Sequence, residues 1–140
     1  MTMATITNKD MTAITDDEII NAEQFEDMRD LLEEDFVDLI QVYFTDCRHR
    51  ITKLRQAQQE EDNANGFELA HALKGASVNL GATQMTRLGS QLQELCRERL
   101  ISEQAPLIED IAVALQRAEQ DINQRLGLFR IRKFRFMNND

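Results

Sequence analysis

The chain of 140 residues contains one proline and five glycines, too few for the many turns of an all-β fold. It has no run of about 18 apolar residues that would span a membrane. Its N-terminus lacks the basic patch and apolar stretch of a signal peptide. We therefore expect a soluble, cytoplasmic protein without a membrane span. With 42% hydrophobic and 29% charged residues, the composition excludes a wholly disordered chain and fits one domain.

Acidic residues outnumber basic ones, and the formal net charge is −9. This charge argues against nucleic acid as a partner, because phosphates are attracted to basic surfaces. The balance reverses at the C-terminus, where five basic residues and one acid follow residue 124. The two cysteines, Cys47 and Cys96, are too few for a disulfide framework and lie within apolar helical patterns. We expect both to be reduced and buried.

Apolar residues at steps of three and four predict helices along most of the chain. Asn21 and Gln24 have the form of a cap with a reciprocal partner, which predicts a short helix near 22–32. The apolar stripe of that helix is Phe25, Met28, Leu31 and Leu32. A long second helix presents one apolar face, formed by Phe36, Leu39, Ile40, Tyr43, Phe44, Cys47, Ile51 and Leu54.

Three further helices follow the charged loop at residues 60–63. Asn65 and Glu68 form a possible capping pair for the third, and Gly81 is its natural end. Apolar steps in the fourth join Met85, Leu88, Leu92 and Leu95. The fifth has Pro106 near its start, Gly127 at its expected end, and a stripe of Ile108, Ile111, Leu115, Ala118 and Ile122.

Four long amphipathic helices with short connections predict an all-α fold, an antiparallel four-helix bundle. The short first helix is expected to cover one end. We expect a flexible leader at 1–19, the bundle domain at 20–126 and a basic, aromatic tail at 127–140. Four interpretations of the tail are open: contact with an acidic partner or a membrane surface, packing against the acidic body, an extension of the last helix, or a loosely held terminus. We expect a monomer, although an apolar stripe serves a core or a dimer equally well.

The segment around His71 carries the most chemistry. At 100° per residue, His71, Lys74, Gly75 and Val78 share one helical stripe, and Ala70, Leu73, Ser77 and Leu80, three of them apolar, share another. If the second stripe enters the bundle, the histidine points to solvent. Ser77 is then expected to be a buried hydroxyl rather than a nucleophile.

Gly75 costs a helix about 1 kcal/mol relative to alanine, a cost that is tolerated where something must approach the backbone closely. A neutral imidazole can attack a phosphoryl group, and Lys74 would offset the charge of the product. The pattern therefore favours a phosphoryl acceptor open to a second protein. A surface histidine beside a glycine of no consequence remains the alternative.

The run His71-x-Leu73-Lys74-Gly75, followed by Leu80-Gly81-Ala82 and an amphipathic helix, resembles the histidine-containing phosphotransfer (HPt) domain of multistep phosphorelays. The likeness extends over residues 20–126. It implies that the histidine accepts a phosphoryl group from the aspartate of a receiver domain in a hybrid sensor kinase. The group then passes to the receiver aspartate of a response regulator. The resemblance implies transfer at the ring nitrogen Nε2.

The resemblance also assigns roles to neighbouring residues. Lys74 matches the residue that supports the phosphoryl group, and Gly75 matches the small residue that admits the receiver. Gln93 matches a Glu or Gln that contacts Nδ1 and orients the ring. Arg97, four residues later, is expected to add positive charge on the same face, and Val78 is a candidate receiver contact. An ordinary solvated polar face is the alternative for Gln93 and Arg97.

Other chemistries lack their motifs. The chain has no Walker-type or G-x-G-x-x-G loop, so we expect a carrier without ATP-dependent kinase activity. His49 is expected to be solvated, and no four-ligand zinc spacing is present, so neither a metal nor a cofactor is expected. Gly89 is expected to permit close helix packing. The rival function is a receiver-binding adaptor that sequesters response regulators without phosphotransfer.

Overall fold

The computed structural model describes residues 18–138, and their side chains as far as Gly127. All regular structure in this part of the chain is helical. In chain order the elements are α2 (Ala22–Leu32), α3 (Asp35–Gln59), α4 (Asn63–Leu80), α5 (Thr83–Arg97), the 3₁₀ turn η1 (Ile101–Glu103) and α6 (Ala105–Asn138).

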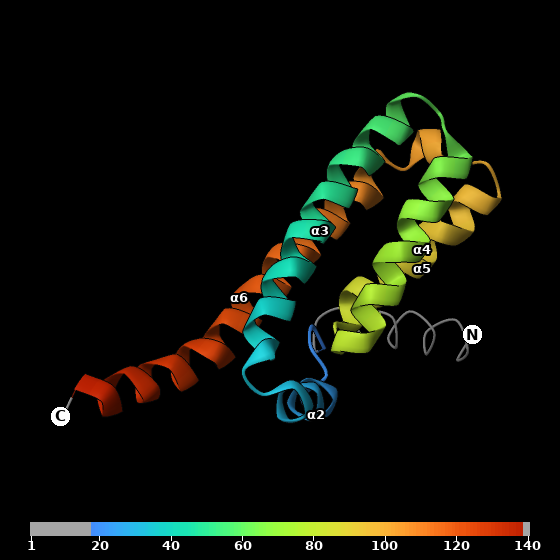
Figure 1. Cartoon of the computed structure of the whole chain (residues 1–140). Helices are drawn as coiled ribbons and strands as arrows, with labels where there is room; N and C mark the ends of the chain where they lie inside the picture. The colour runs from blue at the N-terminus through green and yellow to red at the C-terminus, as the bar shows by residue number, and fades with distance from the viewer. Residues whose placement is uncertain (1–17, 139–140) are drawn as a thin grey trace, which may run out of the picture.

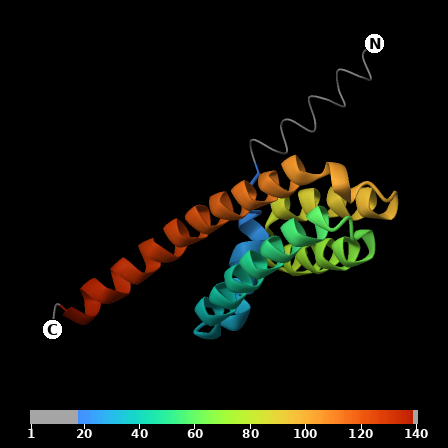
Figure 2. The same cartoon turned by 90° about the horizontal axis from the view of Figure 1, so that it is seen from above.

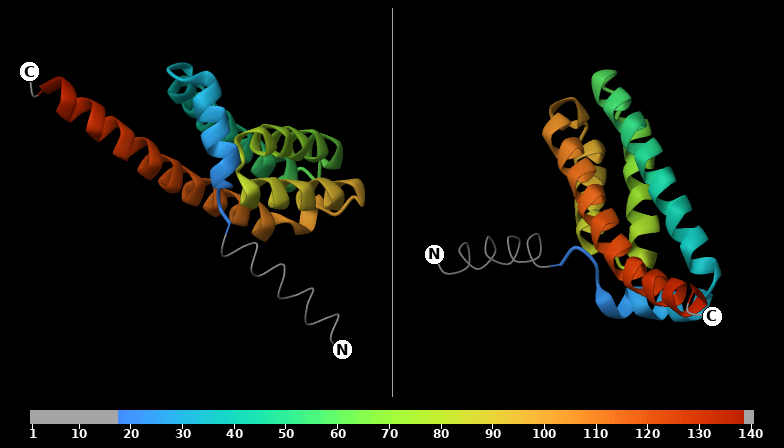
Figure 3. Two further views of the ribbon diagram at one scale, coloured as in Figure 1. Left: turned by 90° about the horizontal axis from the view of Figure 1, so that it is seen from below. Right: turned by 90° about the vertical axis from the view of Figure 1, so that its left-hand side faces the viewer.

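The four long helices α3, α4, α5 and α6 form the bundle, and α2 lies across one of its ends (Figure 1). The α4–α5 pair is the most closely packed, while α6 runs beside both α3 and α5. Figure 3 shows the same four helices from two further sides. The predicted all-α bundle with a short additional helix is confirmed.

Caps and turns decide where the helices begin and end. The side chain of Asn21 accepts a hydrogen bond from the backbone N–H of Gln24, as expected, but the side-chain amide of Gln24 donates to the Val78 carbonyl instead of returning the cap. The expected start of α4 at Asn65 is wrong: Asp62 is the cap, and its carboxylate accepts from the Asn65 N–H. Gly81 ends α4 as predicted, with a φ of 80°.

The last helix is longer than the sequence predicted. Gly127 does not end α6, which continues to Asn138 and extends past the end of the bundle at which α2 lies (Figure 2). A glycine interrupts a helix only when the backbone leaves the helical region, and here it stays within it. None of the helices in residues 18–138 is both long and apolar enough to cross a bilayer. Most of the predicted leader, residues 1–17, lies outside the described part of the chain.

The core lies between the four long helices and contains most of the predicted apolar positions. Two expectations are wrong. Leu31 is 77% exposed on the short α2 helix, on which Phe25 is the buried residue, and Leu39 is 40% exposed on α3. The two cysteines are buried and free, as predicted.

One polar contact crosses the core between α3 and α4. The hydroxyls of Tyr43 and Ser77 lie 2.7 Å apart, and both residues are buried. Each hydroxyl therefore has a partner, which a buried polar group requires. Burial raises the pKa of Tyr43 well above its usual range, so the phenol stays protonated in the folded protein.

We predict that Ser77→Ala lowers the free energy of unfolding by about 1–3 kcal/mol, because it leaves the Tyr43 hydroxyl buried without this partner. Adding Tyr43→Phe to Ser77→Ala recovers part of that loss, since both polar groups are then gone. Urea unfolding of the two single variants and the double variant measures the coupling. If the losses of unfolding free energy in the two single variants simply added up in the double variant, the result would contradict a contact between Tyr43 and Ser77.

Two glycines within helices have opposite surroundings. A Cβ placed on Gly89 of α5 would lie 3.3 Å from the backbone nitrogen of Lys74 and 3.5 Å from the Ala70 carbonyl oxygen. Gly89 thus permits the close approach of α5 to α4, as expected. A Cβ on Gly75 would meet no atom within 4 Å, so the packing of the bundle does not require this glycine.

We therefore expect Gly75→Ala to raise the free energy of unfolding by about 1 kcal/mol, the difference in helix propensity. Gly89→Ala is the matched control, and it gives no such gain because its new methyl crowds α4. Thermal and urea unfolding measure both variants. Equal gains at the two positions would refute the packing role of Gly89.

Candidate functional site

The site is built on the outward face of α4. His71 and Gly75 are exposed, Lys74 is half-buried, and Val78 is 43% exposed. The opposite stripe is buried, as the spacing predicted, and consists of Ala70, Leu73, Ser77 and Leu80. The imidazole therefore stands on the surface of a rigid helix whose other face is held in the core.

The neighbouring helix α5 contacts the imidazole at one edge. Nδ1 of His71 lies 3.3 Å from Oε1 of Gln93, whose side chain is itself buried. Because an amide oxygen only accepts hydrogen bonds, this contact places the proton on Nδ1. In the neutral ring the lone pair then resides on Nε2, at the opposite, outward edge.

One face of the imidazole lies against Phe67, one helical turn earlier on α4. The two ring planes are parallel within 2°, and their centroids are 6.3 Å apart. The guanidinium of Arg97, on α5, lies over the same phenyl ring at 5.5 Å from its centroid. Arg97 also pairs with Glu94 at 3.4 Å. The structure thus places the predicted Arg97 beside Phe67, one turn from His71.

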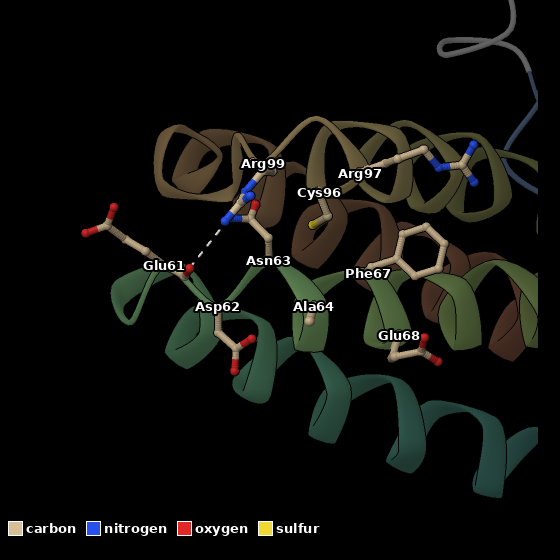
Figure 4. Close-up of a pocket in the computed structure, with 9 residues that line it drawn as sticks. All are labelled: Glu61, Asp62, Asn63, Ala64, Phe67, Glu68, Cys96, Arg97 and Arg99. Carbon is tan, nitrogen blue, oxygen red and sulfur yellow. Dashed lines mark hydrogen bonds between the residues drawn. The ribbon is translucent and has the colours of Figure 1, made fainter.

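Figure 4 shows the hollow next to this aromatic ring, between the start of α4 and the end of α5. The side chain of Arg97 extends on the Phe67 side, whereas Arg99 lies near Asn63. The hollow has a volume of about 480 Å³ and carries charges of both signs. Its lining residues are Glu61, Asp62, Asn63, Ala64, Phe67, Glu68, Cys96, Arg97 and Arg99.

A second hollow, of about 250 Å³, is mainly apolar and lies where α2, α3 and α4 meet. It includes the exposed Leu39 and Val42 of α3 and begins at Ala76, five residues beyond His71 on α4. Its full lining is Met28, Leu39, Val42, Tyr43, Asp46, Ala76, Asn79 and Leu80. Val78 does not line this hollow but is a further exposed apolar side chain on α4.

The other histidine and the two cysteines do not lie on α4. His49 is exposed on α3. Burial raises the pKa of the Cys47 and Cys96 thiols to about 11, so both remain protonated and weakly nucleophilic at neutral pH. Within residues 18–138, no group of three or more His, Cys, Asp or Glu side chains is arranged to hold a metal ion.

Phe67 is a site residue that was not predicted from the sequence. Its signal was present: Phe67 precedes His71 by four residues, the spacing that places two side chains on one helical face. The sequence contains no comparable signal for its contact with Arg97, which belongs to another helix.

Comparison with known proteins identifies the family and the fold. The profile of the Hpt domain matches residues 38–123, more than half of the chain. Among solved structures, the fold is similar to histidine-containing phosphotransfer protein B (HptB) from Pseudomonas aeruginosa PAO1, with a TM-score of 0.73 and 21% sequence identity. That match covers 76% of this chain and 93% of the other. A search of curated protein sequences found no match. On the strength of the profile match, the chain belongs to the Hpt domain family.

Proposed function

We propose that this protein is an intermediate of a phosphorelay, in which His71 carries the phosphoryl group. The donor is a phosphorylated receiver-domain aspartate of a hybrid sensor kinase, and the acceptor is the receiver aspartate of a response regulator. Membership of the Hpt family supports histidine phosphotransfer. The observation that carries the assignment is an exposed imidazole whose Nδ1 faces Gln93, which leaves Nε2 as the free nucleophile.

The two reacting groups of the transfer are the imidazole and the partner's acyl phosphate. The Nε2 lone pair attacks phosphorus, an N–P bond forms, and the P–O bond to the receiver aspartate breaks so that its carboxylate leaves. The Nδ1 proton stays on the ring, where Gln93 accepts a hydrogen bond from it. Attack by a receiver aspartate on the phosphohistidine reverses each of these steps.

Two neighbours of His71 on α4 suit this reaction. Lys74 lies about one turn away and supplies a positive charge that offsets the two negative charges of the phosphoryl group. Gly75 presents bare backbone, and the protein's own packing gives no reason for a glycine there. A glycine that weakens the helix is explained when a partner must approach His71 closely.

The receiver is proposed to dock over Gly75, Val78 and the apolar hollow between α2, α3 and α4. Exposed Val42 and Leu39 add apolar surface to this area. Arg97 would contribute a positive charge at the opposite border of this docking surface. A modest, partly apolar contact suits a carrier, because each partner must be released after transfer.

The protein is proposed to be a carrier rather than an autonomous kinase, since the sequence has no nucleotide-binding loop. The phosphoryl group then comes from another protein. Incubation with labelled ATP alone should leave the pure protein unlabelled. Receiver binding that survives His71→Ala, without acid-labile phosphate on the wild type, would favour the adaptor function instead.

We predict that a phosphorylated receiver transfers its label to the wild-type protein and that His71→Gln abolishes this labelling completely. Glutamine keeps a polar side chain of similar size but lacks the nucleophilic ring nitrogen. His49→Gln is the matched control, because it removes the other histidine of the chain and should leave labelling unchanged. Label retained on the His71→Gln protein would overturn the assignment.

A second prediction distinguishes an effect of Gly75 on receiver docking from an effect on the reactivity of His71. Gly75→Gln should slow transfer from a receiver by about tenfold or more, which corresponds to a docking cost of about 1.4 kcal/mol. Phosphorylation by the small donor phosphoramidate should change little, because no protein has to approach the helix. Equal slowing with both donors would show that Gly75 acts on the histidine itself and not on docking.

A further inference from the structure

We propose that Phe67 is a positioning residue for His71, and that Arg97 holds Phe67 in place for this role. The inference rests on the proposed function of His71, since it assigns the residues that orient the reacting ring. It departs from the role that the sequence suggested for Arg97, which was a charge near the incoming phosphoryl group. In the unphosphorylated protein Arg97 is engaged by Phe67 and Glu94 instead.

A hydrogen bond at Nδ1 does not by itself fix an imidazole. Gln93 restrains one atom at the ring edge, at 3.3 Å, and the ring is still able to tilt about that contact. Phe67 restrains the ring plane, because the two rings lie parallel within 2° in an offset stack. The edge contact and the face contact together determine the direction of the Nε2 lone pair.

The phenyl ring needs a restraint of its own, since Phe67 is only half-buried. Arg97 supplies it by placing its guanidinium 5.5 Å from the ring centroid, within the range of a cation–π interaction. Glu94 pairs with Arg97 at 3.4 Å and thereby limits the freedom of the arginine. The cation, the phenyl ring and the imidazole thus form one continuous row of contacts.

The spacing on the two helices shows why both contacts occur together. Phe67 and His71 are four residues apart on α4, and Arg97 and Gln93 are four residues apart on α5. In this antiparallel pair Gln93 lies opposite His71, and Arg97 lies opposite Phe67. One helix, α5, therefore orients the imidazole directly at its edge and indirectly through the aromatic ring on its face.

The tautomer of the His71 ring tests the proposal without any phosphoryl donor. In ¹⁵N-histidine-labelled protein, with His49→Gln used for assignment, wild-type His71 should be mainly protonated on Nδ1 when the ring is neutral. Phe67→Leu keeps an apolar side chain but removes the ring, and should shift the tautomer ratio toward Nε2–H by about threefold or more. Phe67→Tyr retains the ring and should keep the wild-type ratio.

Arg97→Gln should produce a smaller shift in the same direction, because Phe67 stays but loses its restraint. Arg99→Gln is the matched control: this arginine lines the same hollow but lies near Asn63 rather than Phe67 (Figure 4). Unchanged tautomer ratios in both Phe67→Leu and Arg97→Gln would overturn the proposal. A shift in Arg99→Gln as large as that in Arg97→Gln would overturn the part assigned to Arg97.

Phosphorylation by phosphoramidate supplies the kinetic readout. Phe67→Leu should lower the initial rate at His71 by about threefold to tenfold, and Phe67→Tyr should restore it. Thermal unfolding close to that of the wild type excludes a general loss of structure as the cause. If wild-type His71 takes no phosphate, the proposed function fails. If wild-type His71 is phosphorylated, and Phe67→Leu has the same phosphorylation rate and the same tautomer ratio as the wild type, only the positioning role of Phe67 fails.

Discussion

The close approach of α4 and α5 at Gly89 is the constraint on which the surroundings of His71 depend. With no side chain at Gly89, the backbone of α4 near Lys74 comes within contact distance of α5. One turn further along α5, Gln93 then reaches the edge of the imidazole, and one more turn brings Arg97 to the Phe67 ring. A wider spacing between these helices would lengthen both contacts.

The α4 helix serves stability on one face and chemistry on the other. Its buried stripe packs in the core, where the Ser77 and Tyr43 hydroxyls satisfy each other. Its outer stripe carries the exposed histidine and a glycine that weakens the helix without relieving any crowding within the protein. Because the buried stripe stabilises the helix, the outer stripe can retain Gly75, which leaves room for a partner protein at His71 but adds nothing to packing.

The spacing of apolar residues predicted the helices well. The ends of the helices depend on capping and packing contacts, which this spacing does not specify. The first helix and the Gly81 terminus follow from local caps and were predicted correctly. Asp62 replaced Asn65 as the cap of α4, because several polar residues at 62–65 offered equivalent local choices. Gly127 lies within α6, since one glycine lowers helix propensity but does not force the backbone out of a helix.

The sequence by itself determined the class of fold and the face of α4 on which His71 lies, because both follow from the spacing of apolar residues along single helices. It also predicted Gln93 as a neighbour of the ring, through the resemblance to a family. Only the tertiary structure decided that Arg97 lies over Phe67, that Phe67 stacks on His71, and that Leu39 is exposed. These features depend on the register and the packing distance between helices. Both are set only when the whole bundle assembles.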